Sequence, residues 1–542
     1  MTLPEIVVVL GALLLVVARL LPLHARGPVT AGSAAVVLVS AAVLVVAGVR
    51  WQFVPVLAGA AIMVAFGFPA LLHRPALLHR STLLPRPELP HRPVLSGRPA
   101  RRAPWWVAFP GWVVCVGLVV AGPVAAWAFP VPVFPEPSGR FPVGTLVQQW
   151  TDPNRSELGT PASGRSGSGD SASDRPESGA SASGRSESGT PAPDRPESGT
   201  SASATSDGRR TVVVQFWYPA QGSAAGAARS LYLGRTEQEA RIVSSAAADY
   251  LGVPGFLFDG ASAARTRSVP GAAVADAGGR FPVVLFSPGL GGIRTQNTAW
   301  AEELASLGYV VVALDHPYDS AAVVLADGRT IRSRVAATGN DREDERRAAG
   351  WTEVRAGDLS FVLTQLGRLD RGEIAGALTG RLDTVRAAVT GHSLGGAAAL
   401  RAARQDSRFA AVIDLDGAPH DPDPRPFRQP ALALTHPVDP ADNPTYIPRL
   451  TQVLDLSTAT SYRLTVPGTA HLTFTDAPLY LPPVPALAGS LGRTDGLRIT
   501  AATSAAFLDA TLRGKPGDLA ARLSPYGDLT VHHADGEVRS GG

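Results

Sequence analysis

The sequence has 542 residues, 45% of them hydrophobic, and a formal net charge of +3 at pH 7. This length corresponds to roughly two to four domains, and the near-balanced charge gives no support for a nucleic-acid partner. The single cysteine, Cys115, excludes an internal disulfide and a cysteine-based metal cluster.

Long apolar runs near the start of the chain predict membrane spans: Ile6–Leu23, Val29–Val49, Phe53–Leu72 and Trp105–Phe129. Each is close to the ~20 residues that cross a ~30 Å hydrocarbon core. We therefore expect an all-α bundle of about four transmembrane helices at residues 1–130. Three spans are the alternative, because Arg19 interrupts the first run. A signal peptide followed by buried helices is a further alternative, but the first run opens with Glu5 and three more runs follow it.

Arginines between the third and fourth runs orient the predicted helices: Arg74, Arg80, Arg86, Arg92, Arg98, Arg101 and Arg102. Because cytoplasmic loops are enriched in Arg and Lys, we expect this loop in the cytoplasm and everything after Phe129 outside. A nucleic-acid or lipid-headgroup patch is the alternative interpretation. The sequence thus predicts a multi-pass protein of the cell membrane with an extracytoplasmic soluble domain, a small ester or lipid partner, and no nucleic-acid or protein partner.

Residues 151–200 contain a ten-residue repeat rich in Ser, Gly, Pro and paired charges. Such a composition buries too little apolar surface to offset its ordering entropy, so we expect disorder over residues 156–207. Strand-like segments flank it at Val143–Trp150 and Thr211–Tyr218. We interpret it as an expanded hairpin loop in a soluble domain formed by residues 131–155 and 208–542. A linker after the membrane region is the alternative, and a solenoid is disfavoured because no hydrophobic position repeats.

From residue 281 onward, apolar strands and helices alternate. Strands are expected at Phe281–Ser287, Tyr309–Asp315, Val385–Thr390, Phe409–Asp414, Ala431–Thr435 and Tyr462–Val466. Helices are expected at Gln296–Leu307, Trp351–Leu369, Leu394–Gln405 and near Thr500–Leu512. This pattern predicts an α/β fold with a mostly parallel sheet covered on both faces. Its active site should lie beyond the carboxyl ends of the strands.

The run Gly391-His392-Ser393-Leu394-Gly395 lies between an apolar strand and an Ala-rich helix. A Gly-x-Ser-x-Gly pattern in this context is typical of a sharp turn that exposes a nucleophilic serine in a strained backbone conformation. The flanking glycines relieve clashes in such a turn. Ser393 is therefore the candidate nucleophile, and a glycine turn with an inert serine is the alternative.

A nucleophilic serine needs a base, and the base needs an acid to orient it. In this fold the acid and then the histidine follow the serine along the chain. Asp414 and Asp416 both end a strand, and the pattern alone excludes neither; we favour Asp416, which lies beyond the strand end next to Gly417, and expect a structural role for Asp414. His471 directly follows a late strand and is the expected base. The remaining later histidines are expected at the surface: His420, His436, His532 and His533.

Two backbone N–H groups should stabilise the oxyanion of the reaction intermediate. We expect one from Leu394, just after the nucleophile, and the other from Leu290 in the glycine-rich loop Phe286–Gly292. A phosphate-binding loop is the alternative for this segment, but it lacks the Lys-Ser/Thr ending of such loops. No cofactor or metal site is expected.

These motifs together resemble the platelet-activating factor acetylhydrolase family, the plasma and isoform II lipases, over about residues 134–151 and 210–513. The resemblance rests on Phe286–Gly292, Gly391–Gly396, Leu415-Asp416 and Gly468–His471. It implies an α/β-hydrolase fold without a metal. Pro288 stands where the family has histidine, Leu394 where it has phenylalanine, and Gly417 where it has an aromatic residue.

Carried over to the matching positions, the resemblance implies Ser393 as nucleophile, Asp416 as acid, His471 as base, and N–H donors from Leu290 and Leu394. The hypothesis is ester hydrolysis through an acyl-enzyme, acting on a lipid or other apolar ester such as 1-alkyl-2-acetylglycerophosphocholine. A polyester or short-chain esterase, or an acyltransferase, is the alternative on the same fold. A non-catalytic membrane sensor or scaffold is the alternative from another class, and the complete triad argues against it.

Overall fold

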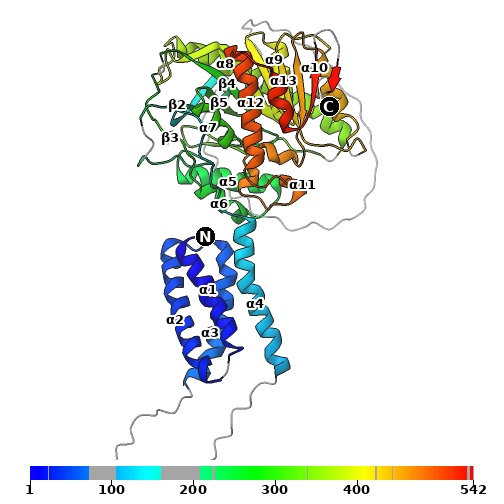
Figure 1. Cartoon of the computed structure of the whole chain (residues 1–542). Helices are drawn as coiled ribbons and strands as arrows, with labels where there is room; N and C mark the ends of the chain where they lie inside the picture. Colours follow the sequence, from blue (N-terminus) through cyan, green and yellow to red (C-terminus); the bar gives the residue numbers. More distant parts are fainter. Residues whose placement is uncertain are drawn as a thin grey trace, which may run out of the picture.

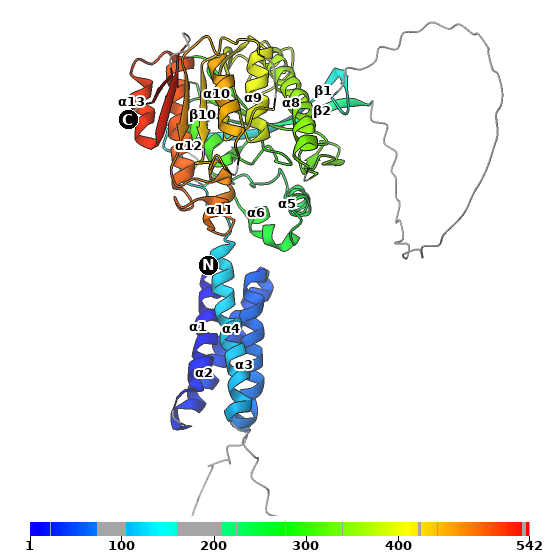
Figure 2. The ribbon, with the colours of Figure 1, turned by 90° about the vertical axis from the view of Figure 1, so that its right-hand side faces the viewer.

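The computed structural model describes residues 1–21, 23–72, 105–159, 208–222, 226–276, 278–338, 340–420, 424–441, 443–533 and 538–540. An elongated helical bundle lies beside one end of a larger α/β domain, and α4 leads from the bundle into that domain (Figures 1 and 2). The predicted arginine-rich loop and the predicted disordered repeat fall almost entirely outside the described residues.

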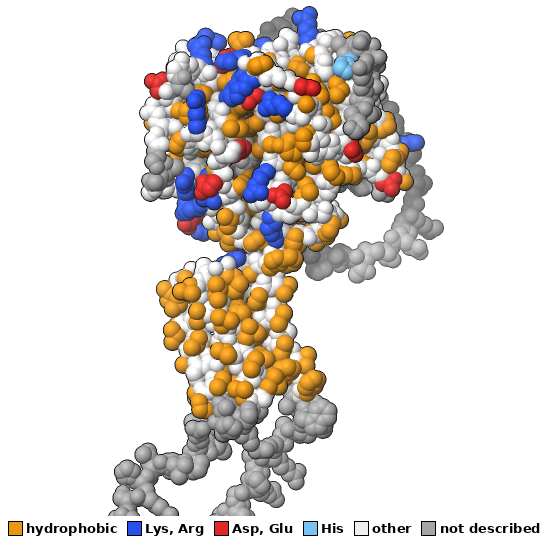
Figure 3. Space-filling view, viewed as in Figure 1, with side chains coloured by type: hydrophobic (Ala, Val, Ile, Leu, Met, Phe, Trp, Pro, Cys, Tyr) orange, Lys and Arg blue, Asp and Glu red, His pale blue; other side chains and the backbone are white. Residues whose placement is uncertain are grey.

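The bundle consists of α1 (Leu3–Ala18), α2 (Leu23–Ala47), η1 (Trp51–Phe53), α3 (Val54–Leu72) and α4 (Trp105–Ala128). By length and hydropathy, two described segments could cross a membrane, Gly27–Ala47 and Phe109–Ala128. The apolar segments Leu3–Ala18 and Trp51–Ala65 are shorter. The first helix ends before the predicted Leu23, because Arg19 and Pro22 follow it and proline restricts the preceding residue to extended conformations. Figure 3 shows that hydrophobic side chains dominate the visible face of the bundle, whereas charged side chains gather on the α/β domain.

One sheet of eleven strands runs through the described part of the α/β domain, in the order β13-β12-β11-β10-β9-β8-β4-β5-β2-β1-β3. Its central strands are parallel, as predicted: β5 (Val310–Asp315), β4 (Phe281–Ser287), β8 (Leu382–His392), β9 (Phe409–Leu415), β10 (Ala431–Thr435) and β11 (Ser461–Thr465). The outer strands are β2 (Arg209–Pro219), β1 (Val143–Ser156), β3 (Val269–Pro270), β12 (Asp528–His532) and β13 (Val538–Ser540). Of these, β1, β2, β12 and β13 run antiparallel to their inner neighbours, whereas β3 runs parallel to β1.

The strands β1 and β2 pair antiparallel from Val143 opposite Pro219 to Asp152 opposite Arg210. They are therefore the two arms of a hairpin whose connecting residues include the repeat. This pairing fits the interpretation of the repeat as an insert in the domain, with strands on both sides of it.

Helices cover both faces of the sheet, and a separate core lies on each face. Along β4, Val283 and Leu285 face one core while Val284 and Phe286 face the other, as the period-2 geometry of a strand requires. The first face packs against α8 (Asp341–Asp370), α9 (Leu394–Gln405) and α10 (Tyr446–Asp455). The second packs against α7 (Thr298–Ser306), α12 (Asp495–Arg513) and α13 (Leu519–Leu523). The predicted parallel sheet covered on both faces is thus confirmed.

Several elements were not expected from the sequence. Besides β3, α10, α13, β12 and β13, they are α5 (Glu237–Leu251), η2 (Gly255–Phe258), α6 (Asp259–Ala263), the hairpin of β6 (Ala322–Val324) and β7 (Thr330–Arg332), η3 (His471–Phe474), η4 (Ala477–Leu479), α11 (Pro485–Ala488) and η5 (Ser524–Tyr526). Helix α8 also begins ten residues before the predicted Trp351, because the side chain of Asn340 accepts a hydrogen bond from the Glu343 N–H and caps the helix there.

The bundle meets the α/β domain near the carboxyl ends of the parallel strands. The ring of Phe256 in η2 contacts that of Trp51 at 4.9 Å between centroids. Arg493, just before α12, donates to the carbonyl oxygen of Trp127 in α4 at 2.7 Å. Both views place α6 and α11 next to the end of α4 (Figures 1 and 2). The edge of the sheet where an active site is expected therefore faces the bundle.

Candidate active site

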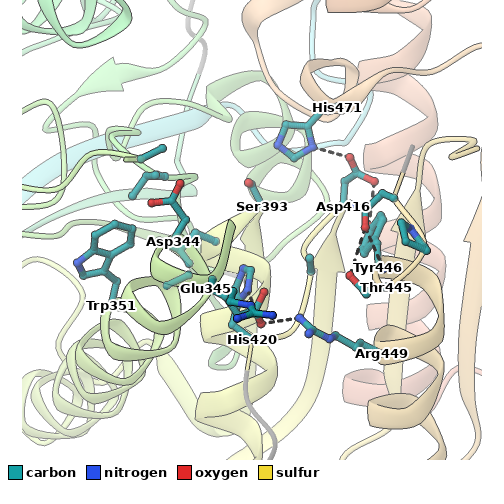
Figure 4. A pocket seen from close by; sticks show the side chains of 18 of the residues that line it. Asp344, Glu345, Trp351, Ser393, Asp416, His420, Thr445, Tyr446, Arg449 and His471 are labelled. Carbon is teal, nitrogen blue, oxygen red and sulfur yellow. Dashed lines mark hydrogen bonds and ion pairs between the residues drawn. The ribbon is translucent and has the colours of Figure 1, made fainter. Parts of the chain in front are cut away.

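Ser393 occupies the tight turn between β8 and α9, with φ of 56° and ψ of −123°. Such a conformation is strained for a residue with a side chain. The turn brings backbones so close that a Cβ atom at Gly391 would lie 2.1 Å from the Gly395 oxygen, and one at Gly395 would lie 2.0 Å from the Ser287 oxygen. Glycine is therefore required at both of these positions of the motif, because any side chain there would clash with the neighbouring backbone. The Ser393 hydroxyl faces the cavity that also receives the ring of His471 (Figure 4).

Asp416 and His471 come together although 55 residues separate them in the chain. Asp416 directly follows β9, is 3% exposed and has φ of 58°. His471 begins η3 after β11. Its Nδ1 lies 2.6 Å from Asp416 Oδ2, which orients the imidazole with Nε2 away from the carboxylate (Figure 4). With the ionised carboxylate as acceptor, Nδ1 carries the hydrogen.

His436 and Tyr446 also bond Asp416. The Nδ1 atom of His436 lies 2.7 Å from Asp416 Oδ2, and the Tyr446 hydroxyl donates to Oδ1 at 3.0 Å. Burial acts to raise the pKa of Asp416, but hydrogen bonds from His436 and His471 prevail and hold that pKa well below its usual value. The carboxylate therefore stays ionised at neutral pH. The hydrogen bond to Asp416 in turn raises the pKa of His436.

The expectation that His436 is a surface residue was wrong, because its ring is half-buried against Asp416. The sequence placed His436 directly after a strand, but only the strand order shows that β10 lies beside β9, so that His436 reaches the same sheet edge as Asp416. His532 is also buried, at 2% exposure, and bonds Asp455. His420 lines the cavity.

Asp414, two residues before Asp416, has a different environment. It is fully buried, and its Oδ1 accepts a hydrogen bond from the Gly417 N–H at 2.9 Å. Burial and the neighbouring charge of Asp416 raise the pKa of Asp414 well above its usual value. A Cβ atom at Gly417 would lie 2.3 Å from Asp414 Oδ1 and 2.6 Å from the Ser393 oxygen. These contacts explain why glycine follows Asp416 in this chain.

A hydrogen-bond chain supports His471 from the other side. The Gly289 N–H donates to Gln296 Oε1 at 2.8 Å, Gln296 Nε2 lies 3.1 Å from His392 Nδ1, and His392 Nε2 lies 3.0 Å from the His471 carbonyl oxygen. A carbonyl only accepts, so Nε2 of His392 carries the hydrogen and Nδ1 accepts from Gln296. Burial and the charge of His471 lower the pKa of His392 to about 3. His392 is therefore a neutral link between the loop after β4 and His471.

The two predicted N–H donors lie in the same cavity as Ser393. Leu290 and Leu394 both line it. Within the described part of the chain, neither backbone N–H has a hydrogen-bond acceptor. Unpaired N–H groups beside a nucleophile are the arrangement that an oxyanion requires. The structure thus brings together all five residues predicted for the site.

The cavity itself has a volume of about 730 Å³. Besides the residues above, α8 contributes Trp351 and Ala348 to its wall, and α10 contributes Arg449. Arg449 forms an ion pair with Glu345 of α8 at 2.5 Å between Nη1 and Oε1. The volume lies within the usual range for small-molecule sites.

Among the described residues, Asp416, His436 and His471 are close enough to hold a metal ion, with their ligand atoms within 4.8 Å of one another. The nitrogen that each histidine presents is Nδ1, which already bonds Asp416. A metal bound by these three groups would replace the bond that orients His471. The donor set therefore fits an acid supported by two histidines better than it fits a metal centre.

The strand order, the strained serine after the central strand β8, and the acid–histidine pair after later strands define an α/β-hydrolase. This chain belongs to the platelet-activating factor acetylhydrolase, isoform II, family, whose model matches residues 190–516. The resemblance seen in the sequence motifs is confirmed.

Individual relatives match smaller regions. The probable 1-alkyl-2-acetylglycerophosphocholine esterase of Arthroderma benhamiae is 31% identical over 137 residues, which cover 25% of this chain and 31% of the relative. The platelet-activating factor acetylhydrolase of Cavia porcellus is 32% identical over 156 residues, covering 26% and 35%. The matched segment thus spans about a third of these relatives.

One solved structure is similar over almost its whole length. A ferulic acid esterase from Streptomyces cinnamoneus aligns with a TM-score of 0.51 and 26% identity, over 73% of this chain and 98% of the esterase. This similarity is consistent with the α/β-hydrolase fold.

Proposed function

We propose that the protein is a serine hydrolase of carboxylic esters. The observation that carries the proposal is the 2.6 Å hydrogen bond between His471 Nδ1 and Asp416, in one cavity with Ser393 and two unpaired N–H groups. The family match and the ester-hydrolysing relatives support the same activity.

In the proposed mechanism, Ser393 Oγ attacks the ester carbonyl carbon while His471 Nε2 takes the hydroxyl proton. Asp416 holds the imidazole and stabilises its charged form without becoming protonated. The N–H groups of Leu290 and Leu394 bond the tetrahedral oxyanion. His471 then returns the proton to the leaving alkoxide, and water attacks the acyl-enzyme by the same route in reverse. The product acid leaves and Ser393 is regenerated.

We propose an extracytoplasmic catalytic domain held by a multi-pass helical anchor of about four spans. Two described helices have the required length and hydropathy. Their side chains, and those of α1, are exposed although apolar, for example Leu10 at 54%, Val46 at 90% and Val114 at 57%. Exposed apolar helix surface of this extent fits a hydrocarbon environment better than water. The arginines of residues 74–102 favour a cytoplasmic loop between the third and fourth helices.

The proposed substrate is a lipid ester, or another apolar ester, that enters from the bilayer. The helices α5, α6 and α11 lie at the end of the domain that faces the bundle (Figures 1 and 2), and apolar side chains in and next to α5, η2 and α11 are exposed. They are Leu251, Phe256, Val484 and Leu487, which are 42–59% exposed. An ester dissolved in the membrane would need to cross little water to reach the cavity. The names of the family and of the relatives point in the same direction.

A soluble short-chain or aromatic ester is the second candidate substrate. The similarity to the ferulic acid esterase favours it, because that enzyme aligns over 98% of its length. The charged residues Glu345 and Arg449 in the cavity wall are also compatible with a polar leaving group.

The test is hydrolysis by the full chain in lipid nanodiscs, measured over a series of acyl lengths in two formats, dissolved in the bilayer and free in water. The proposal predicts Ser393-dependent turnover with preference for bilayer esters. Turnover that persists in the Ser393→Ala variant would refute the catalytic proposal. Preference for the water-soluble series would select the second substrate class.

A further inference from the structure

The loop from Ser287 to Gly292 is held from behind by a buried arginine. Arg355 of α8 is 0% exposed, and all five of its N–H donors are used. Two bonds of 2.6 Å reach the two carboxylate oxygens of Asp319. The other donors reach the Pro288 oxygen, the Gly289 oxygen at 2.9 Å and Ser287 Oγ at 3.4 Å. One guanidinium therefore fixes two consecutive carbonyl groups of the loop.

The Gly289 oxygen accepts from Arg355 and from the Gly292 N–H, each at 2.9 Å, and the direction of this carbonyl determines where the next N–H points. In a planar trans peptide, the carbonyl of one residue and the N–H of the following residue point in opposite directions. The Gly289 oxygen points toward Arg355 in the protein interior. The Leu290 N–H must then point to the other side, where Leu290 lines the cavity beside Ser393. Arg355 itself does not line this cavity.

Asp319 accepts hydrogen bonds from the loop as well as from Arg355. Its Oδ1 lies 3.5 Å from the Gly291 N–H, so it constrains the residue on the far side of Leu290. Burial acts to raise the pKa of Asp319, but the charge of Arg355 and its hydrogen bonds prevail and lower that pKa. Both partners are thus charged, and the pair is bidentate, the arrangement in which an Arg–carboxylate pair is most specific in geometry.

A second buried group supports the start of the loop. Ser287 Oγ lies 2.8 Å from His316 Nε2, and His316 Nδ1 lies 2.8 Å from Asp358. These residue types are those of a catalytic triad, but all three are 0% exposed and cannot meet substrate. Arg210 neutralises Asp358 through two bonds of 2.7 Å. This group holds Ser287, and unlike Arg355 it has no bond to the carbonyls of residues 288 and 289.

We propose that Arg355 and Asp319 are positioning residues for the oxyanion hole, which aim the Leu290 N–H at the reacting carbonyl oxygen. The inference rests on the proposed ester hydrolysis. It assigns a catalytic consequence to an ion pair that touches neither substrate nor the nucleophile. A purely structural pair would affect stability and leave the selectivity of the oxyanion hole unchanged.

The test uses the full chain in detergent micelles with a p-nitrophenyl ester and its thionoester analogue, in which sulfur replaces the carbonyl oxygen. Sulfur is a weak hydrogen-bond acceptor, so the ratio of kcat/KM for the two substrates measures how well the N–H groups are placed. Arg355→Lys and Asp319→Asn are expected to lower kcat on the ester by roughly 10²-fold, with little change in KM. The ratio of kcat/KM for the ester to kcat/KM for the thionoester should therefore fall as well.

Arg210→Gln is the matched control, because Arg210 is a buried, ion-paired arginine of the same domain without a bond to the Pro288 or Gly289 carbonyl. It is expected to lower the melting temperature and to keep the ratio of the unmodified protein. Asp319→Asn is nearly isosteric, so it keeps the test open if the Arg355 variant does not fold.

A ratio that stays unchanged in folded Arg355→Lys and Asp319→Asn variants would overturn the inference. An equal fall of the ratio in Arg210→Gln would also overturn it, because the effect would then be general. Failure of the proposed function is separate and would appear as turnover that does not depend on Ser393.

Discussion

His436 Nδ1 lies 2.7 Å from the carboxylate of Asp416, almost as close as the 2.6 Å bond of the catalytic candidate His471. Asp416 therefore accepts from two imidazoles, and Tyr446 adds a third bond at 3.0 Å. Among the described residues, no arginine or lysine side chain bonds Asp416, and the two imidazoles keep this buried carboxylate ionised. This arrangement also separates Asp416 clearly from Asp414, which has a single backbone donor.

The two aspartates should differ sharply when each is replaced by asparagine. Asp416→Asn is expected to lower kcat by about 10⁴-fold, because asparagine no longer holds His471 in the required tautomer. Asp414→Asn should leave kcat nearly unchanged, since burial and the charge of Asp416 raise the pKa of Asp414 and so favour its neutral form, which asparagine resembles. Steady-state kinetics on a p-nitrophenyl ester compares them. A larger loss in the Asp414 variant would reverse the assignment.

The His436–Asp416 bond should make stability depend on pH. The pKa of His436 is raised in the folded state, so the stabilisation is complete below about 6.5, the usual histidine value, and is lost as the pH rises through the raised pKa. His436→Asn removes this contribution. The melting temperatures of the two proteins should therefore differ most near pH 6 and converge toward pH 9. A difference that stays constant over this range would contradict the account.

Gly417 should not tolerate the aromatic residue that the family resemblance expects there. Gly417→Trp places a Cβ atom against Asp414 and the Ser393 carbonyl, so the loop must move. We expect a loss of about 1–3 kcal/mol in stability and a marked loss of turnover. Gly279→Ala is the control, since no atom lies within 4 Å of its added Cβ. Thermal unfolding and esterase assays measure both, and a Gly417→Trp variant as stable and active as the control would show that the loop adapts.

The exposed side chains of Leu251, Phe256, Val484 and Leu487 form an apolar rim near the bundle. We expect this rim to affect the turnover of bilayer-dissolved substrates only. Leu487 of α11 is 42% exposed on that side, whereas Val385 is 82% exposed at the opposite, amino end of β8. Leu487→Asp is expected to lower turnover of a bilayer-dissolved ester roughly tenfold, because burying a leucine side chain in the bilayer would stabilise the contact with the membrane by about 1.5–3 kcal/mol. It should leave a water-soluble ester unaffected. Val385→Asp should change neither rate, and equal effects of the two variants would argue against a membrane-facing rim.

The sequence predicted the parallel centre of the sheet because continuous apolar strands must be buried on both faces, as β4 and β8 are. It also predicted that Ser393, Asp416 and His471 lie at one edge, because Ser393 and Asp416 directly follow parallel strands and His471 lies in the loop after another. What it missed depends on long-range contacts. Nothing local distinguishes His436 from a surface histidine until β10 is known to lie beside β9.

The buried pair of Arg355 and Asp319 was missed for a similar reason. A charged residue inside a mostly polar helix predicts a solvated face, and Arg355 follows α8 residues that are largely charged. Only the packing of α8 behind the loop of Leu290 turns this arginine inward. The short elements α6 and α11 were missed because they are too short to show a periodic pattern in the sequence. Contacts at the end of the domain that faces the bundle hold them in place.

The central claim is that Ser393 is a nucleophile activated by His471 and Asp416. Labelling of the full chain with a fluorophosphonate, followed by peptide mass spectrometry, tests it most directly, because the probe reacts with an activated serine. The account predicts one adduct, on Ser393, that is lost in Ser393→Ala and strongly slowed in the His471→Ala and Asp416→Asn variants. An adduct on another serine, or labelling of Ser393 at an unchanged rate in both other variants, would contradict it.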